Sequence, residues 1–266
     1  MDLTRWAVGI VLGTAAASLA MRAGALDRPG AVAAAIVGAL TFGGGGLRSA
    51  FLLLLFFVSS SALSRIGKGH KQALSAVFAK GGRRDAGQVV ANGGIAALGA
   101  VLYGLTLQPM WLASLAGALA AVNADTWSTE LGVLARRKPR LVTTGVSVEA
   151  GTSGAVTPEG LLAALGGAGL IGLASGSLFG DWTLAAAGWI GGALGALADS
   201  LLGATVQGIY WCPVCEKETE RHPTHLCGAT TLPRRGWRWL DNDLVNFAAS
   251  VTGAVGATVI WIVCRP

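Results

Sequence analysis

Long apolar runs separated by polar loops recur along the whole chain, and they limit the folds available to it. A helix that crosses a membrane needs about 20 mostly apolar residues. We count eight such runs, at residues 6–20, 29–42, 49–63, 88–107, 110–126, 160–179, 182–202 and 244–263. Hydrophobic residues make up 53% of the 266 positions and charged residues only 13%, whereas soluble domains carry about 25% charged residues. The sequence therefore predicts one integral membrane domain over residues 1–266, an all-α polytopic bundle of about eight spans.

The basic residues are concentrated in alternate loops. With eight spans, the segments 22–28, 64–87, 134–159 and 207–243 share one side and hold 17 of the 20 lysines and arginines, leaving Arg5, Arg48 and Arg265 on the other. Cytoplasmic loops of membrane proteins carry such an excess. We therefore expect these loops at the cytoplasmic face of the cell (inner) membrane and both termini outside. The net charge of +6 then indicates contact with lipid headgroups, not with nucleic acid.

Carboxylates interrupt three apolar runs close to this face. Asp125 lies in the sequence Asn123-Ala-Asp-Thr-Trp-Ser-Thr-Glu130, Asp199 lies near the end of the seventh run, and Asp243 opens the eighth. Ionisable groups at membrane depth are costly and usually functional. On one helix Asp125 and Glu130 point about 140° apart, so they do not form a simple pair. Glu130 fits a role in the site and a solvated position equally well.

Mg²⁺ takes oxygen ligands and is commonly held by one or two carboxylates together with substrate phosphates. We therefore predict that Asp125, Asp199 and Asp243 hold Mg²⁺ and that Asn123 and Asn246 orient them. In the alternative interpretation, each carboxylate hydrogen-bonds a neighbouring helix or caps its own. Asp241 is the expected cap of the last helix.

A basic stretch, Lys80-Gly-Gly-Arg-Arg-Asp-Ala-Gly-Gln88, leads into the fourth run. Arginine binds phosphate oxygens in a bidentate manner and lysine acts as a point charge. Arg84, Gln88 and Asn92 recur at a helical spacing of four, which favours a phosphate-facing stripe. We predict phosphate contacts from Lys80, Arg83, Arg84 and Asn92. The alternative is a basic loop that touches anionic lipid.

Two loops rich in glycine and hydroxyl residues follow the fifth run. They are Arg140-Leu-Val-Thr-Thr-Gly145 and Gly151-Thr-Ser-Gly154. Such loops can present backbone N–H groups to phosphates, although the same residues also make ordinary turns. The predicted nucleotide contacts are Thr144, Gly151, Thr152, Ser153 and Gly154.

The loop at residues 207–241 contains metal-ligand residue types. Cys212 and Cys215 form a Cys-x-x-Cys pair, and His222, His225 and Cys227 follow. Two such cysteines with Cys227 and one histidine can bind zinc tetrahedrally, and we expect Cys212, Cys215, His225 and Cys227 to hold a structural Zn²⁺. The alternative is a set of unligated thiols.

Together these motifs resemble one multispan family of domains of unknown function, which includes plant phytyl-phosphate kinase and the eukaryotic transmembrane protein nineteen. The motifs are Asn123–Glu130, Gly151-Thr-Ser-Gly154, Ala198-Asp-Ser-Leu-Leu-Gly-Ala-Thr205, Lys80-Gly-Gly-Arg-Arg-Asp85 and Leu240-Asp-Asn-Asp-Leu-Val-Asn246. The resemblance extends over nearly the whole chain. The chain departs from the family pattern at Ser153 and Ala155, where the family has Asn and Gly.

The resemblance implies a CTP-dependent kinase that converts an isoprenoid (prenyl or phytyl) monophosphate to the diphosphate with Mg²⁺. The expected partners are this phosphate, the nucleotide and membrane lipids, with a homo-oligomer as a further expectation. Two alternatives stay open from the residues themselves. One is a cytidylyltransferase of the CDP-lipid type, and the other is an ion-coupled transporter, which also carries intramembrane acids.

Overall fold

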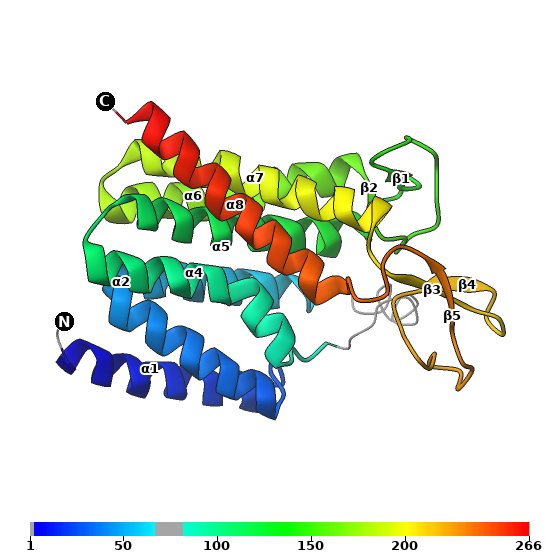
Figure 1. The fold of residues 1–266 in the computed structure, drawn as a ribbon, viewed down its shortest axis with the longest axis horizontal. Helices are drawn as coiled ribbons and strands as arrows, with labels where there is room; N and C mark the ends of the chain where they lie inside the picture. Colours follow the sequence, from blue (N-terminus) through cyan, green and yellow to red (C-terminus); the bar gives the residue numbers. More distant parts are fainter. Residues whose placement is uncertain (1–2, 67–81, 266) are drawn as a thin grey trace.

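The protein is a bundle of long helices lying side by side, with short strands in the loops at one end (Figure 1). The computed structural model describes residues 3–66 and 82–265. In this part the helices are α1 (Leu3–Arg22), α2 (Arg28–Leu63), α4 (Ala86–Thr106), α5 (Met110–Gly132), α6 (Pro158–Phe179), α7 (Trp182–Thr205) and α8 (Asn242–Cys264). The strands are β1 (Arg140–Leu141), β2 (Ala155–Val156), β3 (Ile209–Cys212), β4 (Lys217–Thr219) and β5 (Leu232–Arg235).

Helix α2 reverses direction at Gly46, where φ is +73° and ψ is −168°, a conformation that glycine adopts because it lacks a Cβ. Arg5, near the start of α1, donates to the Gly44 carbonyl. At the other end of α1, Arg65 donates to the Ala23 carbonyl at 3.4 Å. The two halves of α2 therefore run antiparallel, and the break in helical backbone geometry between them is confined to Gly46.

Six helices in the described ranges, namely α1, α2, α4, α6, α7 and α8, are long and apolar enough to cross a membrane. Helix α5 is not among them, and its last turns carry Asn123, Asp125 and Glu130. The prediction of a polytopic helical membrane protein is confirmed. The count of eight spans stays a prediction, in which α2 supplies two passes and α5 one.

Polar caps determine where several helices begin. Asp27, Thr157, Asp181 and Asp241 each accept a hydrogen bond from the backbone N–H three residues further on, which satisfies a donor that the helix itself leaves open. Asp241 is thus the cap of α8, as expected.

Helix α5 lies at the centre of the bundle and packs against α2, α4, α6, α7 and α8. Its residues 112–124 are buried with the single exception of position 114. A Cβ on Gly253 of α8 would lie only 2.5 Å from the Gly117 carbonyl oxygen and 2.6 Å from the Ala121 Cβ. A Cβ on Gly195 of α7 would lie 2.7 Å from the Ala249 carbonyl oxygen. Glycine and alanine therefore let α5, α7 and α8 approach at backbone distance.

The polar loops gather at one end of the bundle. The start of α8, the end of α7 and all five strands lie at the right of Figure 1, and the two chain termini lie at the left. In the loops at the right, β1 pairs antiparallel with β2, and β3 pairs antiparallel with both β4 and β5. The loops at 134–159 and 207–241 therefore lie at the same end of the bundle, while their location on the cytoplasmic side of a membrane stays a prediction.

We expect Gly253→Ala to destabilise the bundle, because the added methyl group overlaps Gly117 and Ala121. Overpacking of this kind costs about 1–3 kcal/mol and should lower the melting temperature of the detergent-purified protein by several degrees. Gly94→Ala in α4 is the matched control, since its Cβ meets only Val90 at 3.5 Å. Equal melting temperatures for the two variants would contradict the proposed close packing.

Candidate functional site

Two of the predicted acidic residues meet at the polar end of the bundle. The carboxyl groups of Asp125 on α5 and Asp199 on α7 lie in hydrogen-bonding contact. The Oδ2 atom of Asp199 is buried, and no donor among the described residues reaches it. Two carboxyl groups in contact repel each other unless they share a proton or a cation. Their position and oxygen chemistry fit a divalent cation such as Mg²⁺.

The third acid, Asp243, lies in the first turn of α8. Helices α7 and α8 are antiparallel (Figure 1), with Gly195 against Ala249. One helical turn beyond Gly195, Asp199 is therefore level with the first two turns of α8, which carry Asp243 and Asn246. Both of these residues are half-buried, so the register of α7 and α8 brings them to the depth of the acidic pair.

Glu130 faces a different neighbour from Asp125. Helix α5 continues to Gly132, so the five-residue spacing turns Glu130 away, and its Oε1 accepts a hydrogen bond from Ser64 Oγ of the α2–α4 loop at 2.5 Å. Glu130 also acts electrostatically on both Asp125 and Arg84. Glu130 is therefore an outer carboxylate that links the acidic pair to the basic stretch.

Arg84 is held firmly in place before the start of α4. Its backbone N–H and C=O bond to Ala25 and Asp27 in the α1–α2 turn. Its guanidinium lies 5.6 Å from the ring centre of Phe56 and 5.3 Å from that of Phe57. Burial lowers the pKa of Arg84, and the Glu130 carboxylate partly offsets this. Its Nη1 atom is buried and has no hydrogen-bond acceptor in the described part of the chain.

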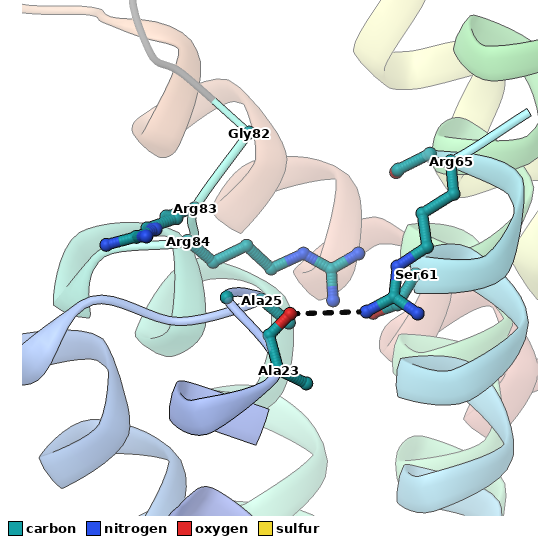
Figure 2. Close-up of a pocket in the computed structure, with 9 residues that line it drawn as sticks. Ala23, Ala25, Ser61, Arg65, Gly82, Arg83 and Arg84 are labelled. Carbon is teal, nitrogen blue, oxygen red and sulfur yellow. Dashed lines mark hydrogen bonds between the residues drawn. The ribbon is translucent and has the colours of Figure 1, made fainter. Parts of the chain in front are cut away.

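A pocket of about 290 Å³ opens beside Arg84. It is lined by Ala23, Gly24, Ala25, Ser61, Ser64, Arg65, Gly82, Arg83 and Arg84. Figure 2 shows the Arg84 side chain extending toward Ser61 and Arg65, whereas Arg83 points the opposite way. A lining with three arginines, hydroxyl groups and backbone is suited to an anion such as a phosphate.

The predicted glycine-rich loop reaches the same end of the bundle. Ser153 donates from Oγ to Gln207 Oε1 at 2.5 Å, and Gln207 Nε2 donates to Glu220 at 3.0 Å. Gly154 has φ of +77° and packs so closely on Ala204 of α7 that a Cβ would overlap its backbone. The loop therefore lies against the end of α7, about one turn beyond Asp199.

Three predicted site residues lie elsewhere or have other partners. Thr144 is exposed, and its hydroxyl accepts only from the Val146 N–H at 3.4 Å. The Oγ1 of Thr152 donates to the Glu149 carbonyl at 2.8 Å within its own turn. Asn123 is fully buried and has structural partners. Lys80 lies outside the described residues.

Asn123 connects three helices. Its Oδ1 accepts from Ser59 and Ser60 of α2 at 3.0 and 3.1 Å, and its Nδ2 donates to the Gly167 carbonyl of α6 at 2.8 Å. These bonds occupy the side-chain amide, so the structure gives Asn123 a packing role and not the expected role of orienting a metal ligand.

The expected stripe of Arg84, Gln88 and Asn92 is interrupted. Helix α4 begins at Ala86, so Arg84 precedes it. Gln88 forms a capping box with Asp85, accepting from its backbone N–H and donating to its carboxylate. Asn92 is half-buried, and its Oδ1 has no hydrogen-bond donor among the described residues, so it stays a candidate for ligand contact.

The four predicted zinc ligands come together. One ligand atom from each of Cys212, Cys215, His225 and Cys227 lies within 4.8 Å of the others. Burial raises the pKa of the Cys212 thiol, but hydrogen bonds from the Cys215 amide and from Cys227 outweigh burial and lower it overall. Contact with Cys227 and burial raise the pKa of Cys215 to about 11. His222 instead stacks on Tyr210, and Cys264 lies at the far end of α8.

Several residues that contact the candidate site residues belong to no motif that the sequence analysis recognised. Ser64 and Arg235 bond to Glu130 and Ser153, which are 66 and 82 positions away. Glu220 acts on Asp199 from the β-strand region. Only the tertiary fold brings such distant positions together.

Comparison with known proteins agrees with this architecture. The family model described as "Integral membrane protein DUF92" matches residues 11–254. The chain belongs to this DUF92 family. It is 34% identical to Protein PGR of Arabidopsis thaliana over 252 residues, covering 84% of this chain and 85% of that protein. It is 38% identical to an uncharacterized membrane protein of Methanocaldococcus jannaschii over 262 residues, covering 97% and 95% of the two chains.

No solved structure matches the fold. The resemblance to a multispan family of unknown function is confirmed by the family model and by these relatives.

We expect Asn123→Ala to destabilise the protein, because it removes the hydrogen bonds that join α5 to Ser59 and Ser60 of α2 and to the Gly167 carbonyl of α6. Ser59 Oγ keeps its bond to the Phe56 carbonyl, so the main loss is at Ser60 and Gly167. Each buried polar group left unsatisfied costs about 1–3 kcal/mol. Asn92→Ala should leave the melting temperature nearly unchanged, because no hydrogen bond to its Oδ1 is lost. Thermal unfolding in detergent compares the two, and a stable Asn123→Ala protein would contradict the packing role.

Proposed function

We propose that the protein is a CTP-dependent kinase that phosphorylates an isoprenoid monophosphate to the diphosphate at one membrane face. The observation that carries the proposal is the contact between Asp125 and Asp199 at the polar end of an apolar bundle. An unpaired carboxylate oxygen there calls for a cation. Phosphoryl transfer mainly requires positioning and neutralisation of phosphate charge. The choice of CTP and of an isoprenoid acceptor rests on the family resemblance of the sequence motifs.

In this proposal Asp125 and Asp199 hold Mg²⁺, with Asp243 from α8 as the third carboxylate. Bound Mg²⁺ would neutralise the charge on the nucleotide phosphates. The Gly151–Gly154 loop, which is packed on α7 near Asp199, would bind the nucleotide through its backbone N–H groups. Asn246 would orient the acids, as expected from the sequence.

Arg84 binds the transferring or the acceptor phosphate. Its guanidinium lies against the rings of Phe56 and Phe57. Its buried Nη1 has no acceptor among the described residues and could donate to a phosphate oxygen. Arg83 and Lys80 would add positive charge from the same stretch. The acceptor is a phosphate that is already largely ionised at neutral pH, so its oxygen attacks the nucleotide without a strong general base.

The lipid-embedded bundle suits an acceptor with an apolar tail. The surface of the helices is rich in exposed apolar side chains, including Leu98, Leu162 and Val255. An isoprenoid chain can lie beside such helices while its phosphate reaches the polar end. In this proposal the polar end binds the phosphates, and the apolar helices accommodate the isoprenoid chain.

The two alternatives differ in measurable products. A cytidylyltransferase releases pyrophosphate from CTP, whereas the proposed kinase releases CDP. An ion-coupled transporter has its site near the midplane, whereas Asp125 and Asp199 lie in the last two turns of their helices. Nucleotide-independent substrate accumulation in sealed vesicles would favour the transporter.

We expect Asp125→Asn to reduce CTP-dependent phosphoryl transfer below about 1% of wild type, as removal of a charge-stabilising group does in other enzymes. Purified protein is incubated with radiolabelled CTP, Mg²⁺ and a series of prenyl phosphates, and CDP and diphosphate products are quantified. Asp241→Asn is the matched control, because it removes the same charge at the same end and asparagine caps α8 equally well. Near-normal turnover by Asp125→Asn would refute the assignment.

Arg84→Gln removes the charge but keeps a polar side chain. We expect a loss in kcat/KM of about 10²–10³-fold. The melting temperature is measured alongside, because the variant also loses the contacts with Phe56 and Phe57. Arg22→Gln is the control, since Arg22 is an exposed basic residue in the last turn of α1 at the same end. An equal effect of the two changes would mean that Arg84 contributes only to the general positive charge of this face.

A further inference from the structure

The segment 207–241, which we call the Cys/His lobe, places four metal-ligand groups around one point. Cys212 Sγ lies 3.5 Å from Cys227 Sγ, and His225 Nδ1 lies 3.5 Å from Cys215 Sγ and 3.2 Å from Cys227 Sγ. In a tetrahedral zinc site with Zn–S bonds near 2.3 Å, two ligand sulfurs are roughly 3.8 Å apart. The spacing therefore fits one zinc ion, and the sulfurs are too far apart for a disulfide, whose S–S length is about 2.05 Å.

The backbone around the cysteines supports the same interpretation. Cys212 ends β3 and β4 begins at Lys217, so the Cys-Pro-Val-Cys turn joins two paired strands. The backbone N–H of Cys215 points to Cys212 Sγ at 3.4 Å. Glu216 has φ of +48°, which is uncommon for a residue other than glycine. Amide N–H groups directed at sulfur stabilise thiolate, the form that binds zinc.

The Cys/His lobe is small, and its buried apolar side chains in the described structure are few, chiefly Ile209, Tyr210 and Leu240. It consists of three short strands, and its side chains at Leu226, Leu232, Trp237 and Trp239 are exposed. Units of fewer than about 40 residues usually need a metal or disulfides to fold. Of the four metal-ligand residues, Cys212 and His225 are buried within this small unit.

The Cys/His lobe in turn holds the glycine-rich loop. Arg235, the last residue of β5, donates from Nη1 to the Gly203 carbonyl of α7 at 2.9 Å and from Nη2 to the Ser153 carbonyl at 3.3 Å. Gln207 accepts from Ser153 and donates to Glu220 just beyond β4. Because β3 pairs with both β4 and β5, an ion that fixes the β3–β4 turn also fixes Glu220 and Arg235.

We propose that Cys212, Cys215, His225 and Cys227 bind one structural Zn²⁺, and that this ion positions the Ser153 loop against the end of α7. The binding of zinc is independent of the proposed kinase activity. Only the consequence for nucleotide binding rests on the proposed function, because that function assigns the Ser153 loop to the nucleotide.

The first test is the metal content of the full-length protein, purified in detergent without chelators and measured by inductively coupled plasma mass spectrometry. We expect one zinc per chain in the wild type and a loss of at least about tenfold in Cys215→Ser. Cys264→Ser and His222→Gln are matched controls, because these residues lie outside the cluster, and both should keep one zinc. Absence of zinc from the wild type, full retention in Cys215→Ser, or a disulfide between Cys212 and Cys227 would overturn the proposal.

The second test needs no variant and so does not depend on the folding of Cys215→Ser. Replacement of zinc by Co²⁺ should give the thiolate-to-cobalt absorption of a tetrahedral sulfur-rich site. Removal of the ion from wild type with a chelator should increase hydrogen exchange in residues 151–156 as well as in the Cys/His lobe, and re-addition of Zn²⁺ should reverse it. Faster exchange confined to the lobe would overturn the positioning role.

Full zinc occupancy in a protein without CTP-dependent transfer would refute the kinase and leave the zinc site intact.

Discussion

The close packing of small residues around α5 is the constraint on which the rest of the structure depends. Within lipid the hydrophobic effect gives little drive for helices to associate, so packing and interhelical hydrogen bonds must supply it. Gly117 and Ala121 of α5 meet Gly253 of α8 at backbone distance, and Gly195 of α7 meets Ala249. Asn123 adds hydrogen bonds to α2 and α6 at the point where α5 becomes polar. Together these contacts fix the rotation of α5 and so the direction in which Asp125 points.

The same packing explains how charged groups persist at the end of an apolar bundle. Asp125 meets Asp199 only because glycines one turn earlier bring α5 and α7 together, and the antiparallel α8 carries Asp243 to the same depth. Arg84 and Glu130 then add opposite charges at the neighbouring pocket. In the proposed kinase, groups from separate helices would together bind the phosphates and their cation.

The Cys/His lobe extends this arrangement beyond the bundle. Its hydrogen bonds to the rest of the protein include those from Ser153 Oγ to Gln207, from Arg235 to the Gly203 carbonyl of α7, and from the Trp237 N–H to the Val206 carbonyl at the end of α7. In the proposal, an ion bound by the four Cys/His residues would act on the Ser153 loop through these hydrogen bonds. The proposed zinc site and the glycine-rich loop are therefore parts of one mechanical unit.

The sequence by itself determined the membrane class and the grouping of the strand-bearing loops at one end of the bundle, and it supplied the candidate site residues. Composition and the spacing of apolar runs are enough to predict these features. The bilayer sets the length of each span and the placement of charge next to it, so each segment can be interpreted on its own. It also identified the four Cys/His residues, whose spacing is local. The tertiary structure decided the rest. It assigned Asn123 to packing, separated Arg84 from the α4 stripe and left Thr144 exposed. It also brought Ser64, Glu220 and Arg235 to the candidate site residues. These outcomes depend on contacts between residues far apart in the chain, and only the packing of the helices determines which distant residues meet.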